Sequence, residues 1–250
     1  MPLIKSPAQI EKMRESGRIV ARALRLTSAH IRQGITPLEL NAIAEGHIRE
    51  EGGVPNFLNY RGFKHAACIS VNDRVVHGVP DARPLREGDI ITLDFGVVKD
   101  GWHADSAWTF PVGEVDDRSR RLMNVTREAL NQGISQARAG KRIGDIGSAV
   151  QRYCEQNGYG VVRELVGHGI GTELHDLPRN VPNFGKANTG ERLQVGMCLC
   201  IEPMVNAGTH EVNTLDDKWT VVTADGLNAA HYEHTVAITK NGPEILTKED

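Results

Sequence analysis

The sequence predicts an α+β fold, built as two similar α/β halves (roughly 1–110 and 111–250) within one domain that spans residues 1–250. Apolar residues at helical spacing alternate with short runs rich in Val and Ile, which indicates helices packed on strands. Two patterns also recur at a nearly constant offset, which indicates an internal duplication. No linker rich in Pro, Gly and Ser divides the chain, and 250 residues can bury a substantial core.

Four segments carry helix signals, two in each half. Ser6-Pro7 supplies an N-cap and a proline at the first helical position, and apolar residues follow at helical spacing as far as Ile31. Thr36 and Glu39 form a capping box for a second helix, which ends at Gly52-Gly53. Further helices are expected at about 119–139 and 144–157.

Strand signals occupy the stretches between and after these helices. Strands are expected at about 67–71, 89–95, 102–110, 161–162, 198–201, 219–223 and 235–238. Lys99-Asp100-Gly101 predicts a hairpin turn. If the turn centres on its first two residues, Asp94 and Asp105 lie directly opposite each other. If it centres on the last two, they are diagonal neighbours on one face.

The duplication is visible at one helix start and at one strand. The helix start at 34–40 recurs loosely 106 positions later, and the strand at 85–94 recurs 108 positions later. Each match is weak alone, but the near-constant offset favours a duplication over chance. We therefore expect an approximate two-fold axis between the halves, with Asp94 and Glu202 ending corresponding strands.

Charge and cysteine content exclude several classes of protein. There are 29 Lys+Arg against 32 Asp+Glu, so no global excess of basic residues is available to bind nucleic acid. No stretch approaches the roughly 18 consecutive apolar residues of a membrane span, and residues 1–7 lack the apolar core of a signal peptide. Four scattered cysteines do not form a disulfide framework. We expect a cytoplasmic protein with no DNA partner and no membrane partner.

Four acidic residues stand beside apolar, strand-like runs. Asp94 ends such a run, and Asp105 shares its face across the predicted hairpin. Glu202 follows another run, and Glu233 precedes a third. Carboxylates buried this close repel each other, which raises their pKa unless a cation lies between them.

A histidine joins these acids as a candidate ligand. His168 lies between two glycines, where the backbone can come close and the imidazole can point inward. Each of the five residues alone favours a structural role. Together, four carboxylates and one imidazole form a hard, oxygen-rich set that is suited to Mn²⁺, Fe²⁺ or Co²⁺ and able to bridge two ions. The sequence therefore predicts a metal centre.

The motifs around these residues resemble those of the type I methionine aminopeptidases of the short bacterial kind. That family has the pita-bread fold, a curved antiparallel sheet covered by helices. The resemblance covers nearly the whole chain, and its motifs are highly specific as a set. They are Cys68-Ile-Ser-Val-Asn-Asp-Arg-Val-Val-His77-Gly-Val-Pro80, Asp94 and Asp105 with ten residues between them, Gly167-His168-Gly-Ile-Gly171, Ile201-Glu202-Pro-Met204 and Tyr232-Glu233-His-Thr235.

The resemblance implies a centre of two divalent ions, Co²⁺, Mn²⁺ or Fe²⁺, with Zn²⁺ as a further candidate. Asp105 and Glu233 would bridge the ions. Asp94 would bind one ion, and His168 and Glu202 would bind the other. A water between the ions would attack the first peptide bond of a chain that begins with methionine.

The resemblance also implies catalytic and substrate-binding residues. Glu202 would be the general base, His175 would stabilise the oxyanion, and His77 would contact the substrate backbone. The methionine pocket would be lined by Tyr60, Phe63, Cys68, His77 and Trp219. The partners would be the N-termini of nascent polypeptides with a small second residue, and the protein is expected to be a monomer.

Two residues depart from the family pattern. Leu174 stands where these enzymes often carry an aromatic residue, so one pocket wall is expected to be softer or wider. His231 stands where Gln is expected, and strand alternation puts it on the face of Glu233. There it could be an extra ligand, a contact behind the ligands, or a partly exposed histidine.

Other interpretations stay open. Proline-directed dipeptidases and aminopeptidases of the same fold generally carry an additional N-terminal domain, for which this chain is expected to have no room. A non-enzymatic binding module would lose metal ligands, whereas all five candidates are present together with His77 and His175. The arginines of the first helix could dock on ribosomal RNA, but a solvated helix face is the preferred interpretation.

Overall fold

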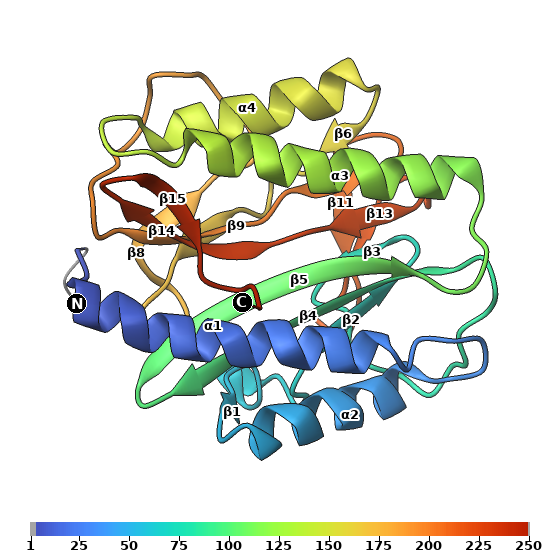
Figure 1. The fold of residues 1–250 in the computed structure, drawn as a ribbon. Helices are drawn as coiled ribbons and strands as arrows, with labels where there is room; N and C mark the ends of the chain where they lie inside the picture. The colour runs from blue at the N-terminus through green and yellow to red at the C-terminus, as the bar shows by residue number, and fades with distance from the viewer. Residues whose placement is uncertain (1–3, 250) are drawn as a thin grey trace.

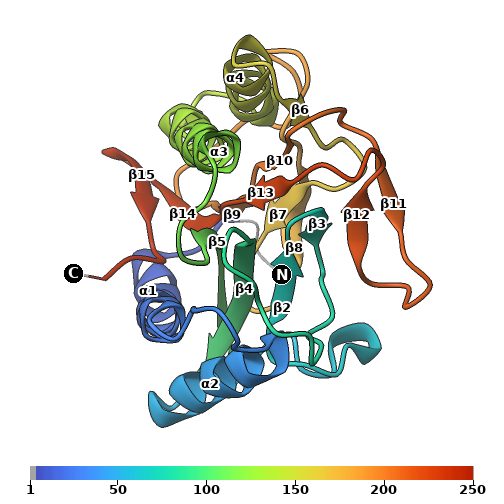
Figure 2. The ribbon, with the colours of Figure 1, turned by 90° about the vertical axis from the view of Figure 1, so that its right-hand side faces the viewer.

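Residues 4–249 are described by a computed structural model of the chain. Four α-helices in this part of the chain cover a set of short antiparallel sheets (Figure 1). They are α1 (Pro7–Ser28), α2 (Pro37–Glu50), α3 (Asp117–Gln136) and α4 (Ile143–Gln156). The pair α1 and α2 lies on the opposite side of the strands from the pair α3 and α4 (Figures 1 and 2). This arrangement is consistent with two related α/β halves.

The helices begin where their capping residues predict. The hydroxyls of Ser6 and Thr36 each accept a hydrogen bond from the backbone N–H three residues on, at 3.3 and 3.2 Å. Helix α1 ends at Ser28, earlier than predicted. The apolar pattern continues to Ile31 because that side chain still packs on the core from the following turn. No helix within residues 4–249 is long and apolar enough to cross a membrane.

Every strand pairing within residues 4–249 is antiparallel. The first half contributes β1 (Val54–Pro55), β2 (Cys68–Val71), β3 (Arg74–Val76), β4 (Ile90–Lys99) and β5 (Trp102–Pro111). The second half contributes β6 (Gly160–Val161), β7 (Gly167–Gly169), β8 (Asp176–Val181), β9 (Cys198–Ile201), β10 (Met204–Asn206), β11 (Val212–Thr214), β12 (Val221–Thr223), β13 (Ala229–His231), β14 (His234–Thr239) and β15 (Gly242–Ile245).

The long hairpin β4–β5 forms the main sheet of the first half, and β2 and β1 pair with β4 at successive positions. The second half contains a five-stranded sheet in the order β15-β14-β9-β7-β8. The halves are joined through β3 and β12, where Val76 lies opposite Val221. Figure 2 shows the β11–β12 hairpin standing to one side of the layered body.

The hairpin turn centres on Asp100 and Gly101, the second of the two predicted registers. Lys99 pairs with Trp102, and both turn residues have positive φ angles, 50° and 78°. A two-residue turn of this kind matches the twist of the flanking strands. Because Gly96 rather than Asp94 lies opposite Asp105, the two acids are diagonal neighbours.

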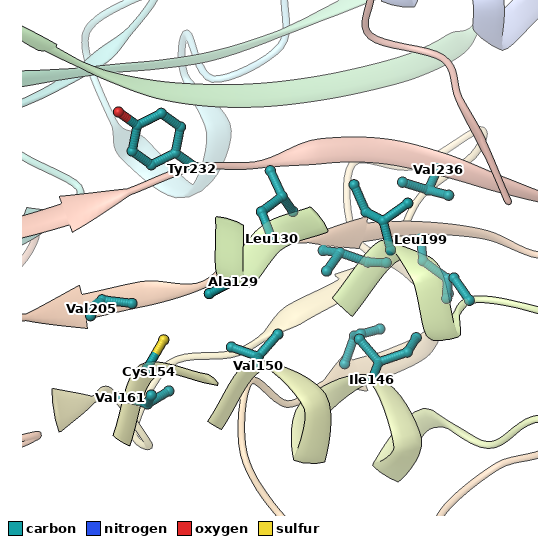
Figure 3. Packing of buried hydrophobic residues seen from close by; sticks show 14 of the residues in the cluster. Ala129, Leu130, Ile146, Val150, Cys154, Val161, Leu199, Val205, Tyr232 and Val236 are labelled. Atoms are coloured by element: carbon teal, nitrogen blue, oxygen red, sulfur yellow. The ribbon is translucent and has the colours of Figure 1, made fainter. Parts of the chain in front are cut away.

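Hydrophobic clusters lie between the helices and the strands in both halves. In the second half, Leu130 of α3 and Ile146 and Val150 of α4 pack over Leu199 and Val236 of the sheet (Figure 3). A matching cluster in the first half packs α1 and α2 on β4. The apolar side chains that recur every 3.6 residues form one face of each helix, and this face packs on the buried face of the strands.

The cysteines are buried as single thiols. All four, Cys68, Cys154, Cys198 and Cys200, are free. Cys198 and Cys200 belong to one hydrophobic cluster, as expected of small apolar side chains on one strand face. Burial raises the pKa of each of these thiols.

Two acids that were expected on strands lie instead where strands are interrupted. Glu202 falls between β9 and β10, and Pro203 after it has no N–H to donate to a ladder. Glu233 separates β13 from β14, and its N–H donates to the Ala107 carbonyl of β5 at 2.8 Å. The strands are therefore interrupted at these positions, although His231 and Glu233 still line one cavity, as the predicted alternation requires. Short strands such as β7 contain too few residues to show a period.

Candidate metal centre

A cavity of about 200 Å³ is lined by residues from both halves. Its lining includes all five predicted metal ligands and all five predicted residues of the methionine pocket. His175 and Leu174 line it as well. The structure thus brings every predicted site residue into one place.

Asp94 and Asp105 reach the cavity from the β4–β5 hairpin. Their exposed fractions are only 6% and 3%. Asp94 pairs across the sheet with Cys68 of β2, which also lines the cavity. The backbone at Asp105 is tied to the second half, because its N–H donates to the Thr235 hydroxyl at 3.0 Å and its carbonyl accepts from the same hydroxyl at 2.9 Å.

Glu202 and Glu233 reach the cavity from the second half. The Glu202 carbonyl accepts a hydrogen bond from the amide of buried Asn183 at 2.9 Å. The Glu233 carbonyl accepts one from the Ser106 hydroxyl of β5 at 2.6 Å. These bonds replace the ladder bonds that an interrupted strand lacks. They fix the two carboxylates beside the hairpin.

His168 is placed by the glycines on either side of it. A Cβ at Gly167 would collide with the Cys200 carbonyl, and one at Gly169 would collide with the backbone at Leu177. Only glycine therefore lets β7 fit between β9 and β8 with the imidazole inside. The prediction that the glycines allow a close backbone approach is confirmed.

Hydrogen bonding selects the tautomer of His168. Its Nδ1 lies 3.0 Å from the Gly169 carbonyl, which can only accept, so Nδ1 carries the proton. The lone pair on Nε2 is then free, and Nε2 lies 3.7 Å from the Glu202 carboxylate. A metal-binding histidine has this arrangement, with one nitrogen held by a carbonyl and the other presented to the ion.

The four carboxyls crowd one another. Burial raises the pKa of all of them, that of Asp105 to about 7. Repulsion by neighbouring carboxylates raises the pKa of Glu202 and Glu233 further. Within residues 4–249, their ion-pair partners are His168 and His231, both beside Glu202. Burial lowers the pKa of both histidines to about 3, so neither supplies a compensating charge.

A divalent cation fits this arrangement. Asp105 Oδ1 and Glu233 Oε1 are buried and have no hydrogen-bond partner. Ligand atoms of Asp105, His168 and Glu233 lie within 4.8 Å of one another, with Cys200 beside them. A cation between them would satisfy the unpartnered oxygens and remove the repulsion. The described residues therefore include a cluster able to hold a divalent metal.

His175 lies at the exposed side of the cavity. Its ring stacks on Tyr60, with centroids 5.4 Å apart, and its Nδ1 lies 2.8 Å from the Tyr60 hydroxyl. Burial lowers the pKa of His175 to about 4, so the ring is neutral at pH 7. If the hydroxyl donates to Nδ1, the ring proton is on Nε2. The His168 ring lies 4.1 Å away, which places His175 beside the carboxylate cluster.

An aromatic group forms another wall. The Trp219 ring makes edge contacts with Phe63 at 5.1 Å and with His77 at 6.4 Å. His77 has a positive φ of 56°, a strained conformation for a residue other than glycine. A Cβ on the next residue, Gly78, would collide with the Ile69 carbonyl. Tight packing against β2 thus forces the chain to turn at His77 and directs its ring toward the cavity.

Several lining residues are not among the site residues predicted from the sequence. The unpredicted ones are Phe57, Arg61, Val76, Leu165, Val166 and Met204. Val76 and Met204 each lie within two residues of a predicted site residue, which could have drawn attention to them. Leu165 and Phe57 lie in loops and become neighbours of the site only through folding.

Comparison with known proteins identifies the family. The sequence profile of metallopeptidase family M24 matches residues 11–240. The chain belongs to this family. Methionine aminopeptidase 1 of Bacillus subtilis (strain 168) is 48% identical over 248 residues, which is 99% of this chain and 100% of that protein. As an M24 metallopeptidase, the chain is a metal-dependent hydrolase.

Solved structures of similar proteins agree with the fold. The crystal structure of methionine aminopeptidase from Thermotoga maritima matches with a TM-score of 0.96 and 44% identity, covering 98% of this chain and 99% of that one. Prolidase from Pyrococcus furiosus matches with a TM-score of 0.81 and 23% identity, covering 99% of this chain and 66% of that one. At that identity the prolidase likeness shows the fold alone. The expected pita-bread fold is confirmed.

Proposed function

We propose that this chain removes the N-terminal methionine from polypeptides whose second residue is small. The observation that carries the proposal is a buried carboxylate cluster beside an aromatic wall, in one cavity of about 200 Å³. That volume is below the roughly 300 Å³ at which pockets for drug-sized ligands begin, and it suits a single side chain. The similarity to methionine aminopeptidases extends over nearly the whole chain.

Five residues would hold two divalent ions, with Co²⁺, Mn²⁺, Fe²⁺ and Zn²⁺ as candidates. The five are Asp94, Asp105, His168, Glu202 and Glu233. Bound there, the ions would polarise the scissile carbonyl and supply a nucleophilic water near neutral pH. Burial of the cluster excludes bulk water and strengthens every electrostatic contact inside it.

Two residues would act on the reacting atoms, one as a general base and one as a hydrogen-bond donor to the oxyanion. Glu202 would accept the proton of the attacking water, because its side chain is the least enclosed of the four acids and its raised pKa suits a base. His175 would donate from Nε2 to the developing oxyanion, since Tyr60 can hold its other nitrogen.

The remaining residues would bind the substrate. Tyr60, Phe63, Cys68 and Trp219 would surround the methionine side chain with apolar and polarisable surface. His77, held at the cavity by its strained backbone, would contact the peptide backbone.

The test is release of methionine from the peptide Met-Ala-Ser. Protein stripped of metal is expected to be inactive, and addition of Mn²⁺ or Co²⁺ should restore release. N-acetyl-Met-Ala-Ser should resist cleavage because it lacks a free amine, and Leu-Ala-Ser should be cleaved much more slowly. Met-Trp-Ser, which has a large second residue, should also be cleaved much more slowly than Met-Ala-Ser.

Two other outcomes would overturn the proposal. Faster cleavage of Xaa-Pro dipeptides than of Met-Ala-Ser would identify a proline-directed dipeptidase or aminopeptidase with the same fold. Binding of ions without cleavage of either substrate would identify a non-enzymatic binding module.

In this proposal the chain is a monomer that acts on nascent polypeptides in the cytoplasm. Three arginines of α1 that could dock on ribosomal RNA pair instead with acids of this chain. They are Arg14 with Glu244, Arg22 with Glu51, and Arg25 with Glu249. These pairs favour a solvated helix face, so the chain should sediment separately from ribosomes and as a single species.

A further inference from the structure

His231 is buried in the same cavity with no hydrogen-bond partner for its ring. It is 1% exposed, and neither of its ring nitrogens has a hydrogen-bond partner. An uncharged imidazole has a lone pair on one of its two ring nitrogens, which is the atom that binds a metal ion. Buried polar groups are nearly always paired, and an unpaired one in a ligand-rich cavity points to a missing partner.

The position of His231 fits a metal ligand better than a hydrogen bond. Its Nε2 lies 3.5 Å from Oε2 of Glu202, too far for a strong hydrogen bond. Two atoms bound to one ion at about 2.1 Å are separated by roughly 3.0–3.5 Å when the angle between the bonds is about 90–110°. Glu202, His231 and Glu233 also offer ligand atoms that all lie within 4.8 Å of one another.

The backbone holds this imidazole firmly. His231 pairs with Met204 between β13 and β10. Its N–H donates to the Thr109 hydroxyl at 3.0 Å, and its carbonyl lies 2.9 Å from the same hydroxyl oxygen. A donor on a strand fixed in this way is preorganised for a ligand.

We propose that His231 is an additional metal ligand, acting through Nε2 on the ion that Glu202 and Glu233 hold. The inference rests on the proposed metal centre and adds a second imidazole to it. Imidazole suits Zn²⁺, whereas carboxylate suits Mn²⁺. His231 therefore raises the preference of the centre for Zn²⁺ over Mn²⁺.

The first test counts imidazoles on the metal in the unmodified protein. Metal-free protein labelled with ¹⁵N-histidine is titrated with Zn²⁺, and the ring nitrogens are followed by NMR. Two histidines, His168 and His231, are expected to shift to metal-bound values. A shift of His168 alone would overturn this inference and leave the metal centre standing. No shift at all would overturn the metal centre itself.

The second test compares His231→Gln with His234→Gln as the matched control. His234 lies three residues on, outside the cavity lining, and its Nδ1 lies 2.8 Å from the Thr247 hydroxyl. Calorimetry of the metal-free proteins should show that His231→Gln weakens Zn²⁺ binding at least about tenfold, and Mn²⁺ binding much less. His234→Gln should bind both ions normally.

Equal weakening for both ions, or none, in His231→Gln would contradict the inference. Equal weakening would indicate that His231 only positions Glu202, and no weakening would indicate that His231 takes no part in metal binding. If His231→Gln fails to fold, as judged by circular dichroism, the NMR count in the unmodified protein decides.

Discussion

The two halves of the molecule present their acidic residues in different ways. Asp94 and Asp105 stand on a hairpin whose two ten-residue strands pair without a break. Glu202 and Glu233 stand where short strands are interrupted. Both pairs end in the same cavity.

This difference shows that a side chain can be placed either by strand register or by contacts between distant segments. A regular ladder places a side chain through its register, which local spacing and the turn determine. Where a strand is interrupted, the backbone must form its hydrogen bonds outside the ladder. The Glu202 carbonyl accepts from the Asn183 side chain, and the Glu233 N–H donates to the Ala107 carbonyl. The first pair is therefore set locally, and the second pair is set by contacts between distant segments.

The largest expected effect is a loss of activity, and it should differ in kind between Asp94 and Glu202, the acids at corresponding positions of the two halves. Glu202→Gln should lower kcat at least about 10³-fold because it removes the general base. Asp94→Asn should act chiefly by weakening metal binding, so excess Mn²⁺ should restore part of its activity. Methionine release at increasing Mn²⁺ measures both. Rescue of Glu202→Gln by metal to near-normal turnover would contradict the assigned role.

The next effect concerns Asp105 of the first half, a proposed bridging ligand between the two ions. Asp105→Asn should lower metal content from two ions per chain to at most one, as measured by elemental analysis after dialysis. The metal-free variant should also unfold at a higher temperature than the metal-free parent, because Asp105 repels the other three buried carboxyls and raises their pKa. Full occupancy by two ions would exclude the bridging role.

A smaller effect is expected where a first-half residue supports a second-half histidine. Tyr60→Phe removes the hydroxyl that lies 2.8 Å from Nδ1 of His175. Loss of one such hydrogen bond should lower kcat roughly two- to tenfold with little change in KM. Tyr159→Phe, outside the cavity lining, is the control and should leave kcat unchanged. An unchanged kcat in Tyr60→Phe would show that this hydroxyl does not orient His175.

The smallest effect compares equivalent capping residues, Glu39 of α2 and Asp145 of α4. Asp145 accepts hydrogen bonds from the backbone N–H groups of Arg142 and Asn188, both at 2.8 Å, whereas exposed Glu39 accepts from the N–H and the hydroxyl of its neighbour Thr36. Asp145→Ala should therefore cost about 1 kcal/mol, measured by urea unfolding, and Glu39→Ala should cost less.

The pH dependence of this pair has a definite sign. Backbone hydrogen bonds lower the pKa of Asp145 below its usual range. Its contribution to stability is thus present at neutral pH and disappears as the pH falls through the lowered pKa. The gap in unfolding free energy between the parent and Asp145→Ala should close in acid. A gap that is constant with pH would exclude the carboxylate as its source.

Much of the site is predictable from local sequence. The capping boxes of α1 and α2 depend on contacts only three residues apart. The need for glycine around His168 follows from an imidazole that must enter a crowded sheet. The inventory of candidate ligands follows from acids placed beside apolar runs, because a buried carboxylate requires compensation.

Other features depend on packing between segments far apart in the chain. Leu165 and Phe57 join the cavity wall without any local signal. His231 is buried with no hydrogen-bond partner for its ring because β13 packs against β10 and Thr109. The same holds for the strand breaks at Glu202 and Glu233.

The amino-acid order was thus sufficient for the choice of ligand types, the helix starts and the two permitted registers of the hairpin, since each depends on near neighbours. Folding alone selected the register centred on Asp100 and Gly101 and brought the acids of both halves to one cavity. The reason is that register, strand interruption and burial are settled by hydrogen bonds and packing across distances that no local pattern records.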